Sequence, residues 1–288
     1  MKKSPVEITT GNNGLPLVKV HTQWSTAEIY LHGAQVTHFQ KHGEPPLIFL
    51  SRQSLFTADK AIRGGIPICF PWFGAREGTV MHGFARLSGW EFTPYAPDFS
   101  GKVALTFTLP EKLLVQAGWP AAKVDYNVTV GEELTLELRV NNTSTQDFVF
   151  EDCLHSYFSV GDISQVSITG LRGIHYVDKV EQLAHKQETG DSIRINSEVD
   201  RVYLNTPGTV EIHDAKLGRT ISVIKSGSAS TVVWNPWINK AKAMADFGDE
   251  EYREMVCVES GNVGESKVTL PPGRQGSLKA VLSSSPLK

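Results

Sequence analysis

The segment TVVWNPWINKAKAMADFGDEEYREMVCVESGNV, residues 231–263, decides the fold, because it places two β-like runs on either side of a polar loop. The first run ends at Asn235-Pro236, since proline has no N–H for a sheet ladder and restricts the residue before it. The loop carries Lys240 and Lys242. The second run, Met255–Glu259, is apolar and contains β-branched residues that favour strands. The segment therefore predicts two strands linked by a polar loop.

Glu259 carries the chemical interest of this segment. Side chains alternate between faces along a strand, so Glu259 shares a face with Met255 and Cys257, whereas Val256 and Val258 point the other way. A carboxylate on an apolar face is costly unless it is paired or exposed in a cleft. Two interpretations stay open: a solvated acid where a strand meets a turn, or a functional carboxylate.

Alternation of apolar and polar residues continues through most of the chain. The alternation is clear over Val103–Leu109. Gly131-Glu132 lies between the runs Lys123–Val130 and Leu134–Val140, which predicts a hairpin. Further strands are expected at Pro16–His21, Ala27–Leu31, Gln35–Gln40, Trp90–Tyr95, Phe148–Val160, Ser164–Thr169, Arg201–Leu204, Val210–His213, Arg219–Ile224, Lys267–Leu270 and Ser277–Leu282.

Many short strands with regularly placed turn residues are typical of a β-sandwich or barrel. Without a linker, repeat or low-complexity segment, residues 1–288 are expected to form one large antiparallel β domain. Both ends, Met1–Pro5 and Ser283–Lys288, are expected to fray. The expected helices are few and short: Ser54–Ala61, Glu111–Ala117 and Asn239–Ala245.

Composition excludes several classes of partner. The net charge is -3 without a long run of either sign, which gives no footprint for nucleic acid or an anionic membrane. No window approaches the roughly 20 apolar residues of a membrane-spanning helix. The N-terminus has no apolar signal-peptide core, so we expect a cytoplasmic protein.

The thiols and histidines do not predict a metal site. Cys69, Cys153 and Cys257 are far apart in apolar runs, which indicates buried inert thiols and neither a disulfide framework nor a zinc site. His38 and His42 have i, i+4 spacing, but the strand period there does not give helical ligand geometry.

Two glycine-containing loops carry candidate anion ligands. Arg63 precedes Gly64-Gly65, which allow tight backbone and close ligand approach. Arg86 ends the run MHGFAR, and guanidinium groups grip phosphate in a bidentate way. Taken alone, an arginine such as Arg63 is more often structural than ligand-binding, and His82 either binds a substrate oxygen or caps a turn.

His155 lies in the run EDCLHSYF and shares a strand face with Cys153 and Tyr157. A histidine in an apolar strand is usually a satisfied core residue. Its ordinary pKa of about 6.5 also suits proton donation near neutral pH. His155 and Glu259 form an acid and base pair only if the fold brings them together.

Other polar and aromatic residues have plainer interpretations. The acidic residues Asp246, Asp249, Glu250 and Glu251 are expected to form a solvated loop. The tryptophans Trp72, Trp234 and Trp237 offer stacking faces for a sugar ring or support loops and core.

Together, the pieces IRGGIPICFPWFG, HGFAR, HSYF, VDRVYLN and VVWNPW–KAMADF–MVCVESGNV resemble the aldose-epimerase superfamily, and more closely its hexose-6-phosphate mutarotase branch. They occur in the family's order between about Ile62 and Val263. The resemblance implies a galactose-mutarotase-like β-sandwich and an isomerase without a cofactor. Its partner would be a small sugar phosphate, and we expect it to act as a monomer.

The resemblance also implies site roles. His155 would be the general acid, Glu259 the general base, and Asp200 a sugar hydroxyl ligand. Arg63 and Arg86 would clamp phosphate and sugar, with His82 beside them. The chain departs from some relatives at Met81, where they carry Gln, and at Ser260, where they carry Pro.

The preferred function is therefore interconversion of the anomers of D-glucose 6-phosphate and related hexose 6-phosphates by acid–base ring opening. Two alternatives are an aldose 1-epimerase of unphosphorylated sugars and a sugar-binding module without catalysis. A glycosidase would need a paired second carboxylate, and the sequence shows none that is convincing.

Overall fold

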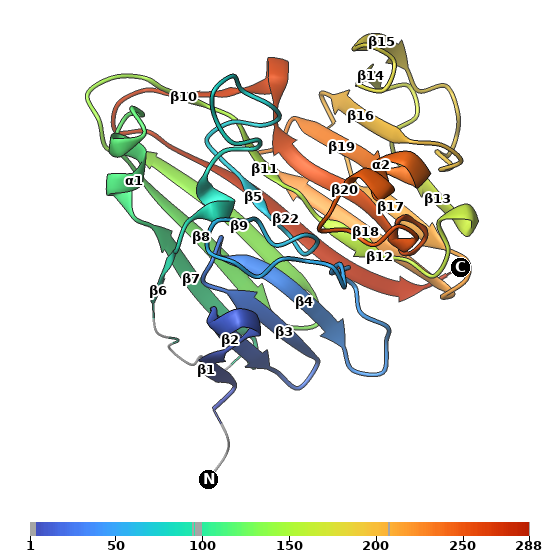
Figure 1. The fold of residues 1–288 in the computed structure, drawn as a ribbon, viewed down its shortest axis with the longest axis horizontal. Coiled ribbons are helices and arrows are strands. Elements are labelled where there is room, and N and C mark those ends of the chain that lie inside the picture. Colours follow the sequence, from blue (N-terminus) through green and yellow to red (C-terminus); the bar gives the residue numbers. More distant parts are fainter. Residues whose placement is uncertain (1–3, 94, 96–99, 207, 288) are drawn as a thin grey trace.

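The computed structural model describes residues 4–93, 95, 100–206 and 208–287. Within these residues the named strands pair antiparallel, and Figure 1 shows them stacked in layers. The expected all-β architecture is confirmed.

One eight-stranded sheet forms the back layer, in the order β13-β17-β18-β22-β9-β8-β7-β6. Its strands are regular because apolar residues occupy every second position, as in β8 and β9, which form the predicted hairpin. The bounds are β6 Glu91–Thr93, β7 Val103–Leu109, β8 Ala122–Val130, β9 Leu134–Asn142, β13 Val166–Thr169, β17 Val210–Asp214, β18 Arg219–Ser226 and β22 Gln275–Pro286.

A second eight-stranded sheet carries the functional residues. Its order is β15-β14-β16-β19-β20-β11-β5, and β12 also pairs with β20. The bounds are β5 Ile68–Cys69, β11 Asp152–Leu154, β12 Tyr157–Ser159, β14 His175–Asp178, β15 Ala184–Gln187, β16 Val199–Leu204, β19 Ser230–Asn235 and β20 Met255–Asn262.

A four-stranded sheet at the N-terminal end, β1-β2-β3-β4, covers another part of the back layer (Figure 1). In the contacts between layers, β3 packs on β8, while β11 and β20 pack on β22. The bounds are β1 Val6–Thr10, β2 Pro16–His21, β3 Ser25–Tyr30, β4 Gln35–Lys41, and β10 Phe148–Phe150 with β21 Val268–Leu270 in a separate pair.

One hydrophobic core fills the space between the layers. It runs in sequence from Val18 to Leu282 and takes Val256 and Val258 from β20. Met255 and Cys257, on the other face of β20, join a smaller cluster with Tyr157. The predicted division of faces along this strand is confirmed.

Several local expectations need correction. The predicted helix Ser54–Ala61 is absent: this segment forms turns, and the Ser54 hydroxyl accepts the Arg63 N–H, a local bond that competes with helix. The run expected as one strand from Phe148 to Val160 divides into β10, β11 and β12. Instead of fraying, β22 stays paired with β18 to Pro286.

The other two helices form close to where they were expected, as α1 Glu111–Gln116 and α2 Trp237–Ala243. Strands β1, β5, β14 and β15 were not predicted. The expected strand Trp90–Tyr95 is shorter, Glu91–Thr93, and residue 94 lies outside the described residues, as do residues 1–3 and 288 of the two ends.

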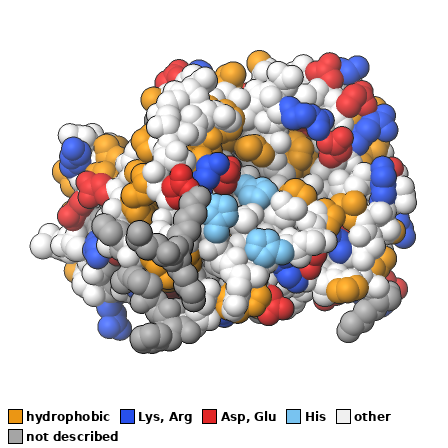
Figure 2. Space-filling model, turned by 90° about the horizontal axis from the view of Figure 1, so that it is seen from below, with side chains coloured by type: hydrophobic (Ala, Val, Ile, Leu, Met, Phe, Trp, Pro, Cys, Tyr) orange, Lys and Arg blue, Asp and Glu red, His pale blue; other side chains and the backbone are white. Residues whose placement is uncertain are grey.

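Across the described residues, no helix is both long and apolar enough to cross a membrane. On the face drawn in Figure 2, Lys and Arg side chains are interspersed with Asp and Glu among the coloured atoms. This face therefore shows no continuous patch of one sign.

Candidate active site

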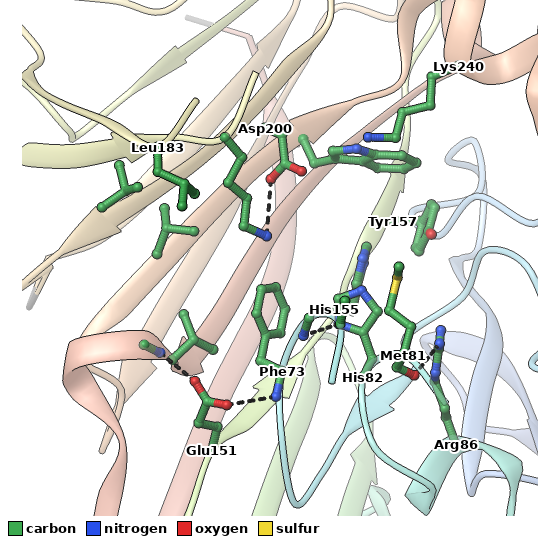
Figure 3. Close-up of a pocket in the computed structure, with 18 of the residues that line it drawn as sticks. Phe73, Met81, His82, Arg86, Glu151, His155, Tyr157, Leu183, Asp200 and Lys240 are labelled. Carbon is green, nitrogen blue, oxygen red and sulfur yellow. Dashed lines mark hydrogen bonds and ion pairs between the residues drawn. The ribbon is translucent and has the colours of Figure 1, made fainter. Parts of the chain in front are cut away.

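A pocket of about 750 Å³ opens beside β16, β19 and the loop that precedes η2 Ala85–Leu87. Five of the six residues proposed from the sequence line it: Arg63, His82, Arg86, His155 and Asp200 (Figure 3). Segments far apart in the chain therefore meet at one pocket.

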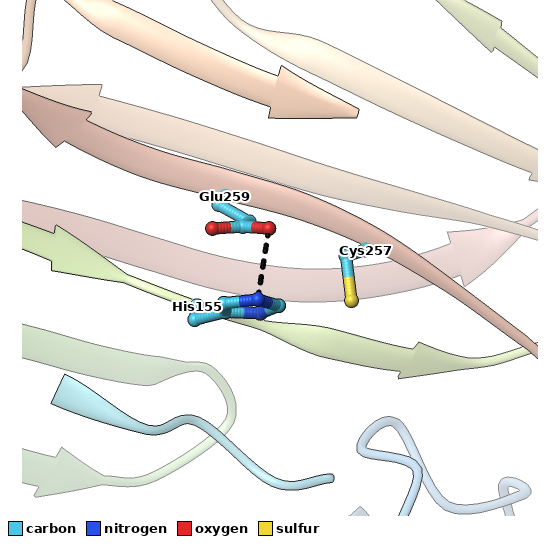
Figure 4. Close-up of side chains that lie close together, drawn as sticks. All are labelled: His155, Cys257 and Glu259. Carbon is cyan, nitrogen blue, oxygen red and sulfur yellow. Dashed lines mark ion pairs between the residues drawn. The ribbon is translucent and has the colours of Figure 1, made fainter. Parts of the chain in front are cut away.

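The sixth residue, Glu259, lies directly beneath His155. Strand register explains this: Leu154 pairs with Ser260 and Tyr157 pairs with Cys257, so His155 faces Glu259 across the two strands. His155 Nε2 lies 3.3 Å from Glu259 Oε1 (Figure 4). Glu259 is 1% exposed, whereas His155 lines the pocket.

Burial and nearby charged groups determine which member of the His155–Glu259 pair carries a proton. Burial raises the pKa of Glu259 to about 8, an effect that the Cys153 S–H donated to Oε2 at 3.3 Å partly opposes. Burial lowers the pKa of His155 well below its usual range, and His82 and Arg86 lower it further. These shifts favour a protonated carboxyl and a neutral imidazole at neutral pH.

The His155 ring is held by aromatic neighbours. It stacks on Tyr157, with ring centroids 4.8 Å apart, and meets the edges of His82 and Trp234 at 5.7 and 6.0 Å. Because the ring is packed on these sides, its orientation toward Glu259 is fixed.

Arg63 is an ion-paired residue of the pocket wall. Its Nη2 and Nε each lie 3.1 Å from Asp246 Oδ2, and its Nη1 donates to the Tyr157 hydroxyl at 3.3 Å. Burial alone would lower the pKa of Arg63, but Tyr157 and Asp246 raise it above its ordinary value. The structural and the substrate-binding interpretations of Arg63 are therefore compatible.

The expected solvated acidic loop is wrong for two of its four residues. Asp246 pairs with Arg63, and the Glu251 carboxylate is buried. Glu251 accepts the Ser51 hydroxyl and the N–H groups of Arg52 and Gly248. These bonds anchor the loop that presents Asp246, because buried carboxylates are stable when hydrogen-bonded.

Arg86 has a different environment. Its Nη2 donates to the Met81 carbonyl at 2.7 Å, and its Nε is buried without a hydrogen-bond partner among the described residues. Within the same residues it forms no ion pair. Burial lowers its pKa, although a guanidinium with this reference value stays charged near neutral pH. Arg86 is thus a cation without a fixed counter-charge in the described part of the chain.

His82 closes the loop that flanks Arg86. Its backbone has φ 63°, its N–H donates to the Gly74 carbonyl at 2.8 Å, and its Nδ1 accepts the Gly74 N–H at 3.1 Å. An accepting Nδ1 places the ring proton on Nε2, because neutral imidazole has one donor. Burial, Arg86 and Lys179 lower the pKa of His82 to about 3. His82 therefore caps the turn and keeps one N–H as a donor.

Glycines let these loops approach neighbouring backbone. Gly83 has φ 71°, and a Cβ there would meet the Phe70 carbonyl oxygen. Gly65 has φ 66°, and a Cβ there would lie 2.4 Å from the Val36 carbonyl oxygen. Only glycine fits both positions, which supports the role expected for the glycines after Arg63.

Asp200 lies on β16 and pairs with Lys179 at 3.6 Å. Burial raises the pKa of Asp200, and Lys179 opposes this shift. The Lys179 ammonium also lies 4.8 Å from the centre of the Phe73 ring. Lys179 carried no signal in the sequence, because the β14–β15 hairpin that presents it has only a weak alternating pattern.

Glu151 is a second missed residue of the pocket wall. Its Oε2 accepts the Phe73 N–H at 3.0 Å, and its Oε1 accepts the Gly264 N–H at 2.5 Å (Figure 3). It thereby joins the loop after β5 to the loop after β20. Glu151 stands between Phe150 and Asp152 in the sequence, and this pattern gave no signal for the role.

The tryptophans and lysines divide between pocket and support. Trp234 and Lys240 line the pocket, and Lys240 pairs with Glu198 at 3.0 Å. Trp237 packs on Tyr252, Trp72 stacks with Trp119, and Lys242 is exposed away from this pocket. Met81 lies at the rim with 53% of its surface exposed.

The sequence of this chain is similar to those of one known protein family. The profile of the family Aldose 1-epimerase matches residues 16–283. A protein of Cenchrus ciliaris provisionally named a glucose-6-phosphate 1-epimerase is 41% identical over 271 residues, covering 90% of this chain and 82% of that protein. A similarly named protein of Escherichia coli (strain K12) is 34% identical over 269 residues, covering 92% and 90%.

Solved structures agree with this likeness. A crystal structure of a provisionally named mutarotase from Salmonella typhimurium superposes with a TM-score of 0.91 at 31% identity, covering 99% of this chain and 95% of that chain. A galactose mutarotase-like protein from Clostridium acetobutylicum, at 14% identity, has a TM-score of 0.71 and covers 98% of each chain. The second likeness concerns the fold alone.

Proposed function

The chain belongs to the aldose 1-epimerase family, and from that premise we propose that it interconverts the α and β anomers of D-glucose 6-phosphate and related hexose 6-phosphates. One observation carries the proposal: the His155–Glu259 pair, 3.3 Å apart, lies beside a pocket that also contains the guanidinium of Arg86, which forms no ion pair with any described residue. The first feature supplies an acid and a base, and the second supplies a partner for phosphate.

The reaction needs one proton donor and one proton acceptor. A base removes the proton of the C1 hydroxyl while an acid protonates the ring oxygen, and the C1–ring oxygen bond breaks. The aldehyde turns its other face, and the ring closes with the two roles reversed. We propose Glu259 as the base and His155 as the acid in ring opening, each worth roughly 100- to 10,000-fold in rate. This chemistry requires no cofactor.

A bound phosphate would shift the proton toward His155. Arg86 and Arg63 both lower the pKa of His155 in this structure. A phosphate dianion beside these guanidinium groups would offset their positive potential and so favour the imidazolium. The substrate would then help to establish the acid and base assignment that ring opening needs.

The remaining pocket residues would orient the sugar. The Nε2–H of His82 is a donor for a sugar oxygen, and Asp200 is an acceptor for a hydroxyl. Lys179 and Lys240 already have carboxylate partners, so we propose that they contribute less than Arg86 to phosphate binding. Trp234 lines the pocket beside His155.

The test is NMR exchange spectroscopy between the α and β anomers of glucose 6-phosphate, with glucose in a parallel sample. Acceleration for the phosphate alone would support both the reaction and the arginine clamp. Acceleration for both sugars would favour an aldose 1-epimerase of unphosphorylated sugars. A folded protein that binds glucose 6-phosphate without accelerating either exchange would overturn catalysis in favour of a sugar-binding module.

We further propose that the chain acts in the cytoplasm as a monomer with one domain. Three buried free cysteines, Cys69, Cys153 and Cys257, support a reducing compartment. The core that runs in sequence from Val18 to Leu282 supports a single domain over residues 1–288. Sedimentation velocity would test the monomer, with a dimer as the contrary result.

A further inference from the structure

Three side chains of metal-binding type meet at the acid–base pair. A ring nitrogen of His155, the Cys257 Sγ and a carboxylate oxygen of Glu259 all lie within 4.8 Å of one another (Figure 4). We propose that this cluster is an inhibitory site for a thiophilic divalent cation such as Zn²⁺. The sequence alone does not indicate this cluster, because its three residues belong to two segments that only the strand register brings together.

The distances fit a tetrahedral zinc ion with small adjustments. Zinc holds nitrogen and oxygen ligands at about 2.0–2.2 Å, so two such ligands are separated by roughly 3.3 Å along one edge of the tetrahedron. The observed separation of His155 Nε2 and Glu259 Oε1 is 3.3 Å. Sulfur binds zinc at about 2.3 Å, so the Cys257 Sγ would need to close in by up to about 1.3 Å from the 4.8 Å limit of the cluster.

The donor set determines the class of metal. Imidazole and thiolate favour zinc and other soft or borderline cations, whereas magnesium and calcium prefer all-oxygen sites. Three protein ligands leave a fourth position for water or a sugar hydroxyl, as in zinc centres that are not closed. His155 lines the pocket, which gives the ion a path to the cluster.

Neighbouring groups hold the Glu259 carboxylate in place but leave the Nδ1 atom of His155 without a hydrogen-bond partner among the described residues. The Cys153 thiol donates to Glu259 Oε2 at 3.3 Å, which leaves Oε1 directed to His155. His155 Nδ1 is buried and has no hydrogen-bond partner among the described residues. Metal-bound histidines usually have their second ring nitrogen held by such a partner. We therefore expect reversible binding that a chelator removes.

Occupation of this site would stop the reaction. The metal would take the lone pairs of His155 and Glu259, and binding near neutral pH would release two protons to solvent, one from the Cys257 thiol and one from the Glu259 carboxyl. The inhibitory consequence rests on the proposed function, whereas binding of the ion does not. The two can therefore fail separately.

The experiment titrates ZnCl₂ into the full chain by calorimetry, and CoCl₂ with absorption spectroscopy to detect a thiolate-to-cobalt charge-transfer band. Wild type should bind one zinc ion, show the band, and lose both after chelation. Cys257→Ser and Cys257→Ala should weaken zinc binding at least about 10-fold, because changes to supporting residues alone cost 10- to 100-fold. Cys69→Ser, at another buried thiol, is the matched control and should retain zinc binding.

Absence of zinc binding to folded wild type would overturn the site, and so would equal affinity in the Cys257 variants. If these variants do not fold, the cobalt band of wild type decides the question, since a site without thiolate gives no such band. Anomer exchange of glucose 6-phosphate is then measured with and without zinc. Inhibition that Cys257→Ala relieves supports the full proposal, whereas zinc binding without inhibition overturns its inhibitory part.

Discussion

The Asp246 carboxylate lies 3.1 Å from the Arg63 guanidinium, although 183 residues separate the two in sequence. This pairing distinguishes two arginines that look equivalent in the sequence. Arg63 carries a counter-charge within the protein, whereas Arg86 donates to a backbone carbonyl and has no acidic partner among the described residues. Arg86 is therefore the stronger candidate for reading the phosphate.

Arg86→Ala should raise KM for glucose 6-phosphate by roughly 10- to 100-fold, since one charged hydrogen bond contributes about 1.5–3 kcal/mol. The KM for glucose, if glucose reacts at all, should change much less. Arg76→Ala is the matched control, because Arg76 lies over Trp72 and Trp119 outside this pocket. An equal loss for both sugars in Arg86→Ala would argue that Arg86 does not read the phosphate.

Glu259→Gln and His155→Ala should each lower kcat for anomer exchange by at least about 100-fold, because each removes one member of the acid–base pair. Glu259→Gln preserves shape and removes a buried ionisable group, so thermal unfolding should stay close to wild type. Near-normal kcat in either folded variant would contradict the assignment. Val256→Ala, on the opposite face of the same strand, tests whether general damage to β20 suffices to reduce kcat.

Strand periodicity was enough to predict which face Glu259 occupies, whereas the resemblance implied a role for His155 without its position. The register of β11, β12 and β20 in the structure places His155 opposite Glu259. Lys179, Glu151 and Asp246 could not be assigned in the same way. Their roles depend on a hairpin with a weak pattern and on loops joined across long sequence distances. The predicted helix Ser54–Ala61 was wrong for a similar reason, because it depended on a contact outside the segment. The Ser54 hydroxyl accepts the Arg63 N–H, and this bond competes with helix formation.

The pH dependence of kcat/KM should reflect two events at the His155–Glu259 pair: loss of the single proton that the two residues share, and binding of a second proton. Above the pKa of Glu259, about 8, the pair loses that proton and the rate should fall. On the acid side, the lowered pKa of His155 means that the second proton binds only well below 6.5, so the rate should hold through neutral pH. A rate that continues to rise above pH 8 would contradict this distribution.

Asp152 provides a stability test that is independent of catalysis. Burial raises its pKa to about 7, although Asn262 donates to Oδ1 at 2.9 Å. Between the ordinary aspartate pKa of about 3.8 and 7, the unfolded chain has released this proton while the folded chain retains it. The folded state therefore loses stability as pH rises, by up to about 1.4 kcal/mol per pH unit from this group.

Asp152→Asn removes this proton difference and retains an oxygen for Asn262. Urea unfolding between pH 5 and 7 should therefore show a smaller loss of free energy of unfolding with pH in the variant than in wild type. Contributions of Glu259 and His155 are common to both proteins and cancel in the comparison, provided that their surroundings are unchanged. Parallel curves for variant and wild type would show that Asp152 is already ionised in the folded protein at pH 5.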